Sequence, residues 1–288
     1  MSCLVAAVTG CSAKGANSDS TTEDPAVAQS APVTSPSPSA SPSPTATSST
    51  AITSAIRTYM ATRSGQASVT VKDLSTGATY SYNTRLRVAT ASIVKADILA
   101  CLLLQAQSAG RRLTSSEKAL ATKMIENSDN NAASALWTKI GRHSGMVAAN
   151  RKLGLTQTTP GSGSTWGLTT TSAADQVRLL TALTSSKSKL SAASRSYELG
   201  LMSQVERDQR WGVSAAADDD DTTSLQLKNG WMPQTAYQNR WTINSIGQVK
   251  SGGHAYLIGV LSRKNVSMAD GISTIQHVVK LAVKAIKT

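Results

Sequence analysis

Three short motifs in the chain contain two serines and two lysines, residue types that can carry out nucleophilic acyl transfer. Residues 92–95 read S-x-x-K, residues 128–130 read S-D-N, and residues 228–230 read K-N-G. A serine hydroxyl becomes an effective nucleophile when an adjacent base accepts its proton. The motifs in this order therefore predict a reaction that passes through a covalent intermediate on the first serine.

Ser92 and Lys95 are predicted to lie on one face of a helix. Apolar residues recur at helical spacing after Ser92, which places this serine at the helix start, near the positive end of the helix dipole. A residue three positions on lies one turn along the same face. A lysine buried among apolar groups has a depressed pKa and can act as a base. Taken alone, this segment also fits a helix-capping serine and a solvated lysine.

The other two motifs are expected at a turn and at the end of a strand. Residues 128–130 end one helical run and precede another, where short polar residues also serve as helix caps. Residues 228–230 are expected to terminate a strand whose Leu225 and Leu227 face the core. Gly230 lets the backbone approach a ligand closely.

The ordered triple resembles the signature of class A β-lactamases and related penicillin-recognising serine enzymes. The resemblance implies that Ser92 is the acylated nucleophile and that Lys95 accepts its proton. It also implies that Ser128 relays a proton to the leaving nitrogen and that Asn130 binds the substrate amide. In the same scheme Asp129 holds the turn.

The resemblance gives roles to the third motif as well. Lys228 would supply positive charge near Ser128 and the substrate carboxylate, and the N–H groups of Trp231 and Ser92 would form the oxyanion hole. Position 229 departs from the usual Thr or Ser. Because the amide of Asn229 can still donate a hydrogen bond to a carboxylate, we expect altered substrate preference more than loss of the site.

Two departures from the family pattern put efficient β-lactam turnover in doubt. Class A enzymes carry a loop Glu that activates the deacylating water, but residues 158–168 contain no acidic residue. Asp175 follows on the next helix and is interpreted as a first-turn residue or part of a solvated face. The short spacing between the first two motifs also predicts a more open cleft.

The order of elements predicts an α+β fold with three layers, of the β-lactamase-like type. An antiparallel five-stranded sheet is expected to be flanked by helices, with an all-helical domain inserted at about residues 92–203. The expected elements are a helix at 53–60, strands at 68–74, 78–82, 224–228, 241–246 and 255–261, and a closing helix at 272–286.

The first fifty residues are not expected to join the core. Residues 12–50 are rich in Ser, Pro, Thr and Ala, which predicts a disordered tether before a hydrolase domain at 51–288. Residues 1–11 resemble a signal remnant whose Cys11 ends a bacterial lipobox and would be lipidated. The basic and apolar regions of a signal peptide are weak here, so an ordinary N-terminus with an unmodified thiol is the alternative.

Composition sets the remaining expectations. The net charge of +12 suits an anionic neighbourhood such as a membrane face or wall polymers, and the scattered basic residues argue against nucleic acid. The histidines, His143, His254 and His277, lack metal-ligand spacing, so neither a zinc hydrolase nor any cofactor is expected. No stretch is expected to span a membrane, and Cys101 is expected to have no disulfide partner.

The sequence therefore predicts an extracytoplasmic serine hydrolase, lipid-anchored or, if the lipobox is unused, secreted. It would act as a monomer on a β-lactam or cell-wall peptide, with slow deacylation. The alternatives are a binding or sensor lipoprotein that stays acylated, or an enzyme of the D-alanyl carboxypeptidase or esterase type.

Overall fold

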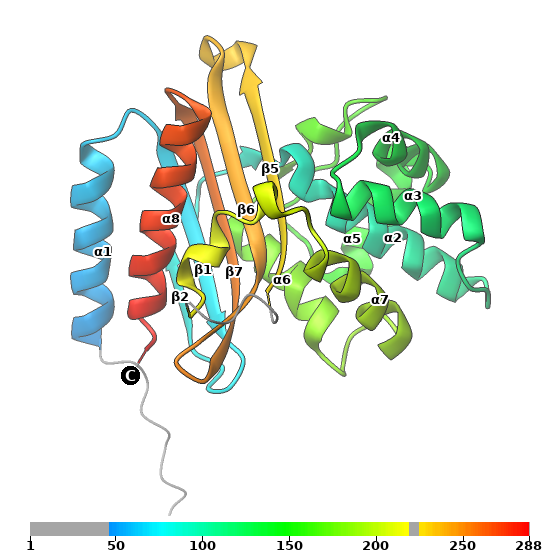
Figure 1. Cartoon of the computed structure of the whole chain (residues 1–288), viewed down its shortest axis with the longest axis horizontal. Helices are drawn as coiled ribbons and strands as arrows, with labels where there is room; N and C mark the ends of the chain where they lie inside the picture. The colour runs from blue at the N-terminus through cyan, green and yellow to red at the C-terminus, as the bar shows by residue number, and fades with distance from the viewer. Residues whose placement is uncertain (1–45, 219–224, 288) are drawn as a thin grey trace, which may run out of the picture. The chain divides into compact units, whose positions relative to one another are not determined.

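The computed structural model describes residues 46–218 and 225–287, so Cys11 and residues 12–45 of the expected tether lie outside the described residues. One antiparallel sheet contains five strands in the order β2-β1-β7-β6-β5 (Figure 1). The strands are β1 (Gln66–Asp73), β2 (Thr79–Tyr82), β5 (Gln226–Gln234), β6 (Arg240–Ser251) and β7 (His254–Asn265). The predicted five-stranded antiparallel sheet is confirmed.

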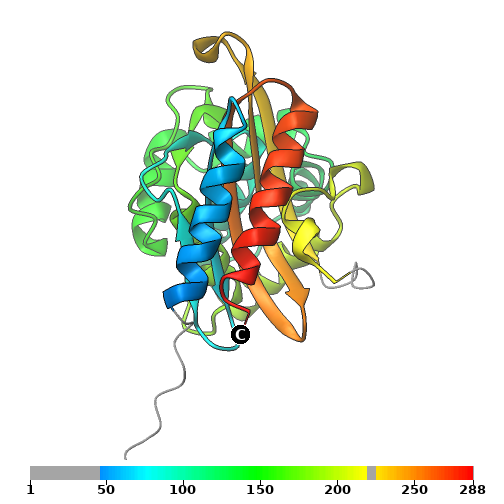
Figure 2. The ribbon, with the colours of Figure 1, turned by 90° about the vertical axis from the view of Figure 1, so that its left-hand side faces the viewer.

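Two terminal helices cover one face of the sheet. Helix α1 (Ala46–Ala61) and helix α8 (Met268–Lys284) lie side by side against the strands (Figure 2). Helix α8 begins where the Ser267 side chain accepts a hydrogen bond from the N–H of Asp270, and its apolar side faces the sheet. Helix α1 starts earlier than expected and includes residues 46–50, which the sequence analysis assigned to the tether.

The opposite face of the sheet is covered by α6 (Ala173–Thr184), which packs on β1, β6 and β7. The helical block is completed by α2 (Val94–Ser108), α3 (Ser115–Glu126), α4 (Asn130–Lys139), α5 (Arg142–Leu153) and α7 (Ala192–Ser203). Figure 1 shows the resulting layers of helix, sheet and helix. The predicted three-layer α+β fold is confirmed.

The inserted block is not purely helical. Strand β4 (Thr170–Thr171) pairs with β3 (Val88–Ala89) in a second sheet of two strands. An isolated bridge between Thr159 and Thr170 joins the preceding loop to β4. These short pairings fix the loop at 158–168 beside the start of α2.

Helix α2 forms the centre of the helical block. Residues Ala91–Ser108 are apolar and long enough to cross a membrane by length and composition, which the sequence analysis did not expect. However, 78% of this segment is buried inside the protein, and helices that are apolar all round are typical of protein cores. Cys101 is buried on this helix and is a free cysteine.

Candidate active site

Ser92 lies in a single 3-10 turn (Ala91–Ile93) that leads directly into α2. Ala91 has a φ of 47°, a conformation that residues with a side chain rarely adopt. This bend turns the chain from β3 into the helix and leaves the Ser92 side chain half-buried while its neighbours Ala91 and Ile93 are buried. The serine therefore stands at the N-terminal end of α2, as expected.

Lys95 is fully buried, and its amine lies at the centre of the polar cluster. The Nζ atom lies 2.9 Å from Ser92 Oγ, and it also contacts Ser128 through the carbonyl at 2.6 Å and the hydroxyl at 3.1 Å. Asn130 Oδ1 lies 2.8 Å from the same nitrogen. Burial lowers the pKa of Lys95 to about 7, although the charge of Asp129 opposes the shift. A large share of these amines is therefore neutral near pH 7 and able to accept the Ser92 proton.

The S-D-N motif forms the turn between α3 and α4. Ser128 adopts a left-handed conformation with a φ of 56°, which a tight turn requires here. Asp129 accepts a hydrogen bond from the N–H of Ala132 at 2.6 Å and so caps α4. This cap leaves Ser128 and Asn130, on either side of Asp129, to face Lys95.

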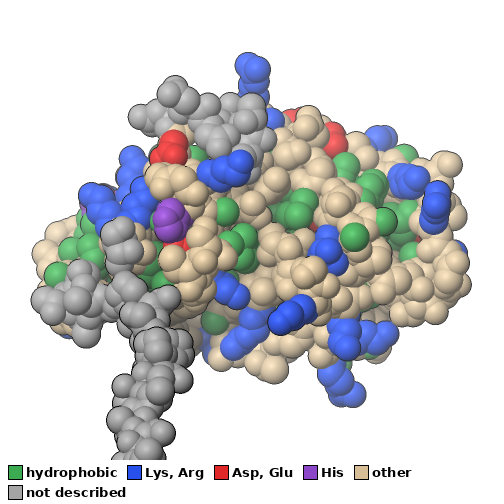
Figure 3. Space-filling view, turned by 90° about the horizontal axis from the view of Figure 1, so that it is seen from below, with side chains coloured by type: hydrophobic (Ala, Val, Ile, Leu, Met, Phe, Trp, Pro, Cys, Tyr) green, Lys and Arg blue, Asp and Glu red, His purple; other side chains and the backbone are tan. Residues whose placement is uncertain are grey.

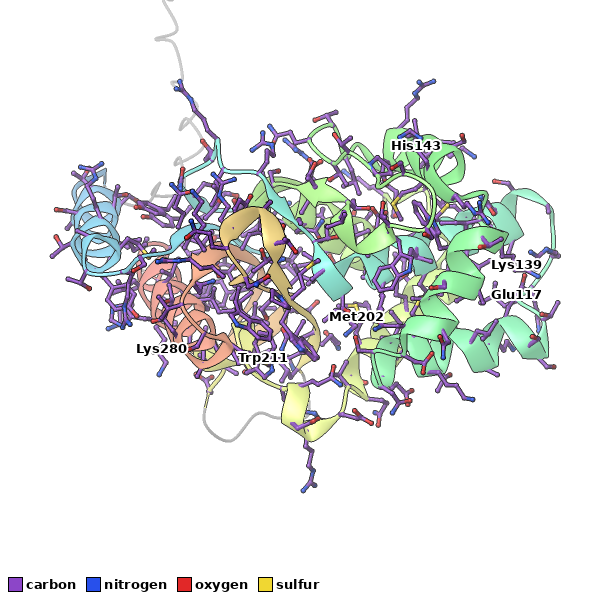
Figure 4. The ribbon with its side chains drawn as sticks, turned by 90° about the horizontal axis from the view of Figure 1, so that it is seen from above. Glu117, Lys139, His143, Met202, Trp211 and Lys280 are labelled. Carbon is purple, nitrogen blue, oxygen red and sulfur yellow. The ribbon has the colours of Figure 1, made fainter. Side chains whose placement is uncertain are left out.

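Ion pairs away from the cleft hold the two helices that carry this turn. Glu117 of α3 is buried, and its carboxylate binds Arg111 at 2.8 Å and Lys139 of α4 at 3.3 Å. Figure 4 shows Glu117 and Lys139 facing each other across these helices. Hydrogen bonds from Arg111 lower the pKa of Glu117 to about 2, so this clamp remains charged at physiological pH. The clamp fixes α3 against α4 and thereby supports the turn.

Lys228 projects from β5 into the same cluster and is fully buried. Its Nζ atom lies 3.0 Å from Ser128 Oγ, so this hydroxyl bridges the amines of Lys95 and Lys228. Burial, and secondarily the charge of Lys95, lower the pKa of Lys228 well below its ordinary value. Ser128 therefore connects two amines that both favour the loss of a proton.

The third motif lies inside β5 and not at its end, because the strand continues to Gln234. Gly230 is required by close approach, since a Cβ atom there would lie 2.7 Å from the backbone nitrogens of Ser92 and Ile93. The strand thus runs directly against the turn that carries the nucleophile. This contact places the backbone of Trp231, the next residue, beside the Ser92 turn.

Asn229 does not face the cleft, which corrects the expectation that its amide meets a substrate carboxylate. The side chain is fully buried, and its Nδ2 donates to the carbonyls of Gln209 at 2.5 Å and Trp211 at 2.9 Å. Neighbouring side chains in a strand point to opposite faces, so a strand that aims Lys228 at the site must aim Asn229 away. Its contacts give Asn229 a positioning role for residues 209–211.

An aromatic pair lies beside this strand. The rings of Trp211 and Trp231 are half-buried and pack edge to face, with their centroids 5.8 Å apart. Trp211, labelled in Figure 4, is held by its carbonyl contact with Asn229. Trp211 was not predicted as a site residue, because only the fold brings it to β5.

A tryptophan takes part in the loop that lacks an acidic residue. The ring of Trp166 lies 5.0 Å from Lys95 Nζ, and its Nε1 donates to Ser134 Oγ at 3.1 Å. Trp166 is the second residue that sequence reasoning missed. No local signal distinguishes it, because the position depends on the bridge between Thr159 and Thr170.

Asp175 is buried at the base of the same loop, which corrects its interpretation as part of a solvated face. Its carboxylate accepts hydrogen bonds from the Gln157 N–H at 2.6 Å and the Thr158 hydroxyl at 2.8 Å, and it pairs with Arg178. Asp175 therefore anchors the loop. Within the described residues, the loop places no carboxylate beside Lys95.

Comparisons with known proteins agree with the contacts among Ser92, Lys95, Ser128 and Lys228. The sequence model of the family described as "Beta-lactamase enzyme family" matches residues 51–118 and 104–286, which together cover most of the chain. The chain belongs to the beta-lactamase enzyme family. Membership was predicted from the three motifs, and the match confirms it.

Solved structures of class A β-lactamases share the fold. TLA-1 extended-spectrum β-lactamase is 16% identical with a TM-score of 0.72, over 83% of this chain and 100% of that chain. A class A β-lactamase from Bacteroides cellulosilyticus is 15% identical with a TM-score of 0.70, over 83% and 98%. A variant of an ancestral Gram-negative class A enzyme, bound to 5(6)-nitrobenzotriazole, is 22% identical with a TM-score of 0.67, over 81% and 98%.

A curated relative shares part of the sequence. A protein named "Putative lipoprotein LppW", from Mycobacterium bovis and from Mycobacterium tuberculosis, is 34% identical over 119 residues. The aligned region covers 41% of this chain and 38% of the relative's length. The chain therefore spans less than half the length of this relative.

Proposed function

We propose that the chain is a serine hydrolase that forms an acyl-enzyme on Ser92 with a β-lactam or related amide and deacylates slowly. The observation that carries this proposal is the continuous line of contacts from Ser92 through Lys95 and Ser128 to Lys228, with separations of 2.9, 3.1 and 3.0 Å. Such a line can move a proton from the nucleophile to a leaving group.

Acylation begins with Lys95 as the base. In its neutral form the amine takes the Ser92 proton, and Ser92 Oγ attacks the carbonyl carbon to give a tetrahedral oxyanion. The N–H groups of Ser92 and Trp231 are proposed to stabilise this oxyanion, because Gly230 brings β5 against the Ser92 turn. Asn130 turns its Oδ1 toward Lys95, which directs its amide nitrogen toward the substrate.

Collapse of the intermediate requires a proton on the leaving nitrogen. Ser128 lies between the two amines and would donate its hydroxyl proton as the C–N bond breaks, while the Lys95 ammonium returns a proton to Ser128. Lys95 is then neutral again and Ser92 carries the acyl group. Lys228, when charged, attracts a substrate carboxylate at this end of the cleft.

Slow deacylation follows from the composition of the loop. Hydrolysis of the acyl-enzyme needs a base for water, and a positioned base contributes about 10²–10⁴-fold in rate. Trp166 stands 5.0 Å from Lys95 Nζ and offers no basic atom. The carboxylate of Asp175, at the base of the loop, is already engaged by Gln157, Thr158 and Arg178. The acyl-enzyme should therefore persist.

The proposed location is the outer face of the cell membrane, through lipidation of Cys11. The resemblance of the segment ending at Cys11 to a lipobox, and the similarity to the mycobacterial protein named as a putative lipoprotein, support this location. The proposed ligand is a small β-lactam or a wall peptide, with the chain acting as a monomer.

Intact-protein mass spectrometry after mixing the chain with a penicillin tests the proposal. We expect an adduct of the penicillin's mass that forms on the native chain, lasts, and is absent from Ser92→Ala. Labelling of Ser92→Ala at the native rate, or no labelling of the native chain, would contradict it.

The time course also separates the alternative functions. An adduct that never decays favours a binding or sensor lipoprotein. Rapid decay with ring-opened product makes the chain an efficient β-lactamase and refutes slow deacylation. Turnover of a D-alanyl peptide or an ester without a penicillin adduct favours the carboxypeptidase or esterase alternative.

A further inference from the structure

A hollow separate from the active-site cluster lies on the face of the sheet that α6 covers, and none of its lining residues belongs to the three motifs. It has a volume of about 520 Å³ and lies between β1, β2 and the exposed side of α6, closed by the end of α5 and residues 185–189. We call it the basic groove, because its charged lining residues are Lys72, Lys152, Arg178, Lys187 and Lys189.

The charge of the basic groove is almost unopposed. Among the residues that the structure describes, no Asp or Glu lines it, and of its charged residues only Arg178 forms an ion pair, with the buried Asp175. Within residues 46–218 and 225–287, the four lysines have no carboxylate oxygen within 4.0 Å. Lys152, Lys187 and Lys189 are exposed and Lys72 is half-buried, so the positive charge is accessible from solvent. An anion that binds there meets no neighbouring carboxylate among the lining residues.

The side of the groove formed by β1 and β2 is polar, whereas the side formed by α6 includes Ala174, Val177 and Ala182. Val69 and Val71 of β1 are fully buried, whereas the alternate residues Thr70 and Lys72 line the groove. The Thr70 and Ser81 hydroxyls, paired across β1 and β2, lie 3.0 Å apart. One of the two hydroxyls donates to the other, so one O–H of the pair is left to donate to a phosphate oxygen beside the ammonium groups.

We propose that the basic groove binds an anion with several closely spaced phosphate groups, such as an oligophosphate or a segment of a phosphodiester polymer. The lysines stand on β1, on α5 and on the 185–189 segment, and so surround the hollow from separate elements. Lys72 is half-buried while the other three lysines are exposed, so a compact anion that enters the hollow approaches Lys72 more closely than a flat bilayer would. Figure 3 shows Lys and Arg side chains spread over the lower surface with few acidic ones, which would draw a polyanion toward this side.

Isothermal titration of the full chain with sodium tripolyphosphate at about 0.15 M salt tests the proposal. The groove variant combines Lys72→Gln, Lys152→Gln and Lys187→Gln. A matched control combines Lys250→Gln, Lys280→Gln and Lys284→Gln, which remove the same charge from exposed positions on β6 and α8. We expect the native chain and the control to bind within about twofold of each other, and the groove variant to bind at least about tenfold more weakly.

Three results would overturn the proposal. The first is no binding of tripolyphosphate by the native chain, and the second is an equal loss in both triple variants, which would indicate only net charge. The third is binding to phosphatidylglycerol vesicles, sensitive to the groove lysines, without binding of tripolyphosphate. Circular dichroism and the thermal midpoint confirm that each variant is folded, and penicillin labelling of Ser92 is measured separately.

Discussion

Lys95→Met should change the pH dependence of stability in a direction fixed by the burial of the amine. Burial lowers the pKa of Lys95 to about 7 in the folded chain, against about 10.4 in an unfolded chain. Between these values the unfolded chain binds more protons than the folded chain. The unfolding free energy of the native protein therefore rises with pH through this window and falls as the pH drops toward 7.

The magnitude follows from the same two pKa values. Integrating the proton difference from about pH 7 to about pH 9 gives the native protein roughly 2 kcal/mol that Lys95→Met cannot gain. Methionine keeps much of the side-chain length in this fully buried position but carries no titrating group. The variant also lacks the base, so its labelling by a penicillin should fall by at least about 10²-fold.

Urea unfolding followed by tryptophan fluorescence at several pH values measures this difference. A control, Lys250→Met, removes a lysine that is exposed on β6 and should follow the native pH dependence. If the difference in unfolding free energy between the native chain and Lys95→Met stayed constant across the window, the argument that burial depresses the amine's pKa would be refuted.

Two further changes test the loop and the anchor. Trp166→Glu places a carboxylate beside Lys95 and should shorten the acyl-enzyme lifetime at least about tenfold relative to Trp166→Gln. Glutamine has the shape of glutamate but no basic oxygen, so equal lifetimes by mass spectrometry would show that the missing loop base does not limit deacylation. Cys11→Ala in the full chain should move the protein from the membrane fraction to the soluble fraction of a bacterial host, and an unchanged distribution on immunoblots would rule out the lipid anchor.

Much of the fold was predictable because the hydrophobic patterns are local. The apolar face of the closing helix and the Gly252–Gly253 turn between β6 and β7 can be predicted from the sequence alone. The motif positions were also predictable, since Ser92 precedes an apolar helical run and residues 128–130 separate two such runs. The length of β5 was not, because its residues beyond Gly230 pair with β6 through tertiary register.

Other features of the site depend on contacts between distant segments. Trp166 reaches Lys95 because the loop is fixed by Thr170, and Asp175 is buried because it caps the same loop. The orientation of Asn229 could have been predicted, because the two-residue period of a strand requires its side chain to point away from that of Lys228. Only the structure gives its partners, the carbonyls of Gln209 and Trp211.

The strand order has a consequence for the nascent chain. Strand β1 is synthesised early, yet its long partner is β7, which the ribosome adds near the end. Lys228 likewise emerges long after Ser92 and Lys95, so the polar cluster is assembled from opposite ends of the synthesis. Pairings of such large sequence separation form late in folding. A chain that stops before β7 therefore contains every residue of the polar cluster but lacks the strand that joins β1 to β6, so the sheet that aims Lys228 at Ser128 is incomplete.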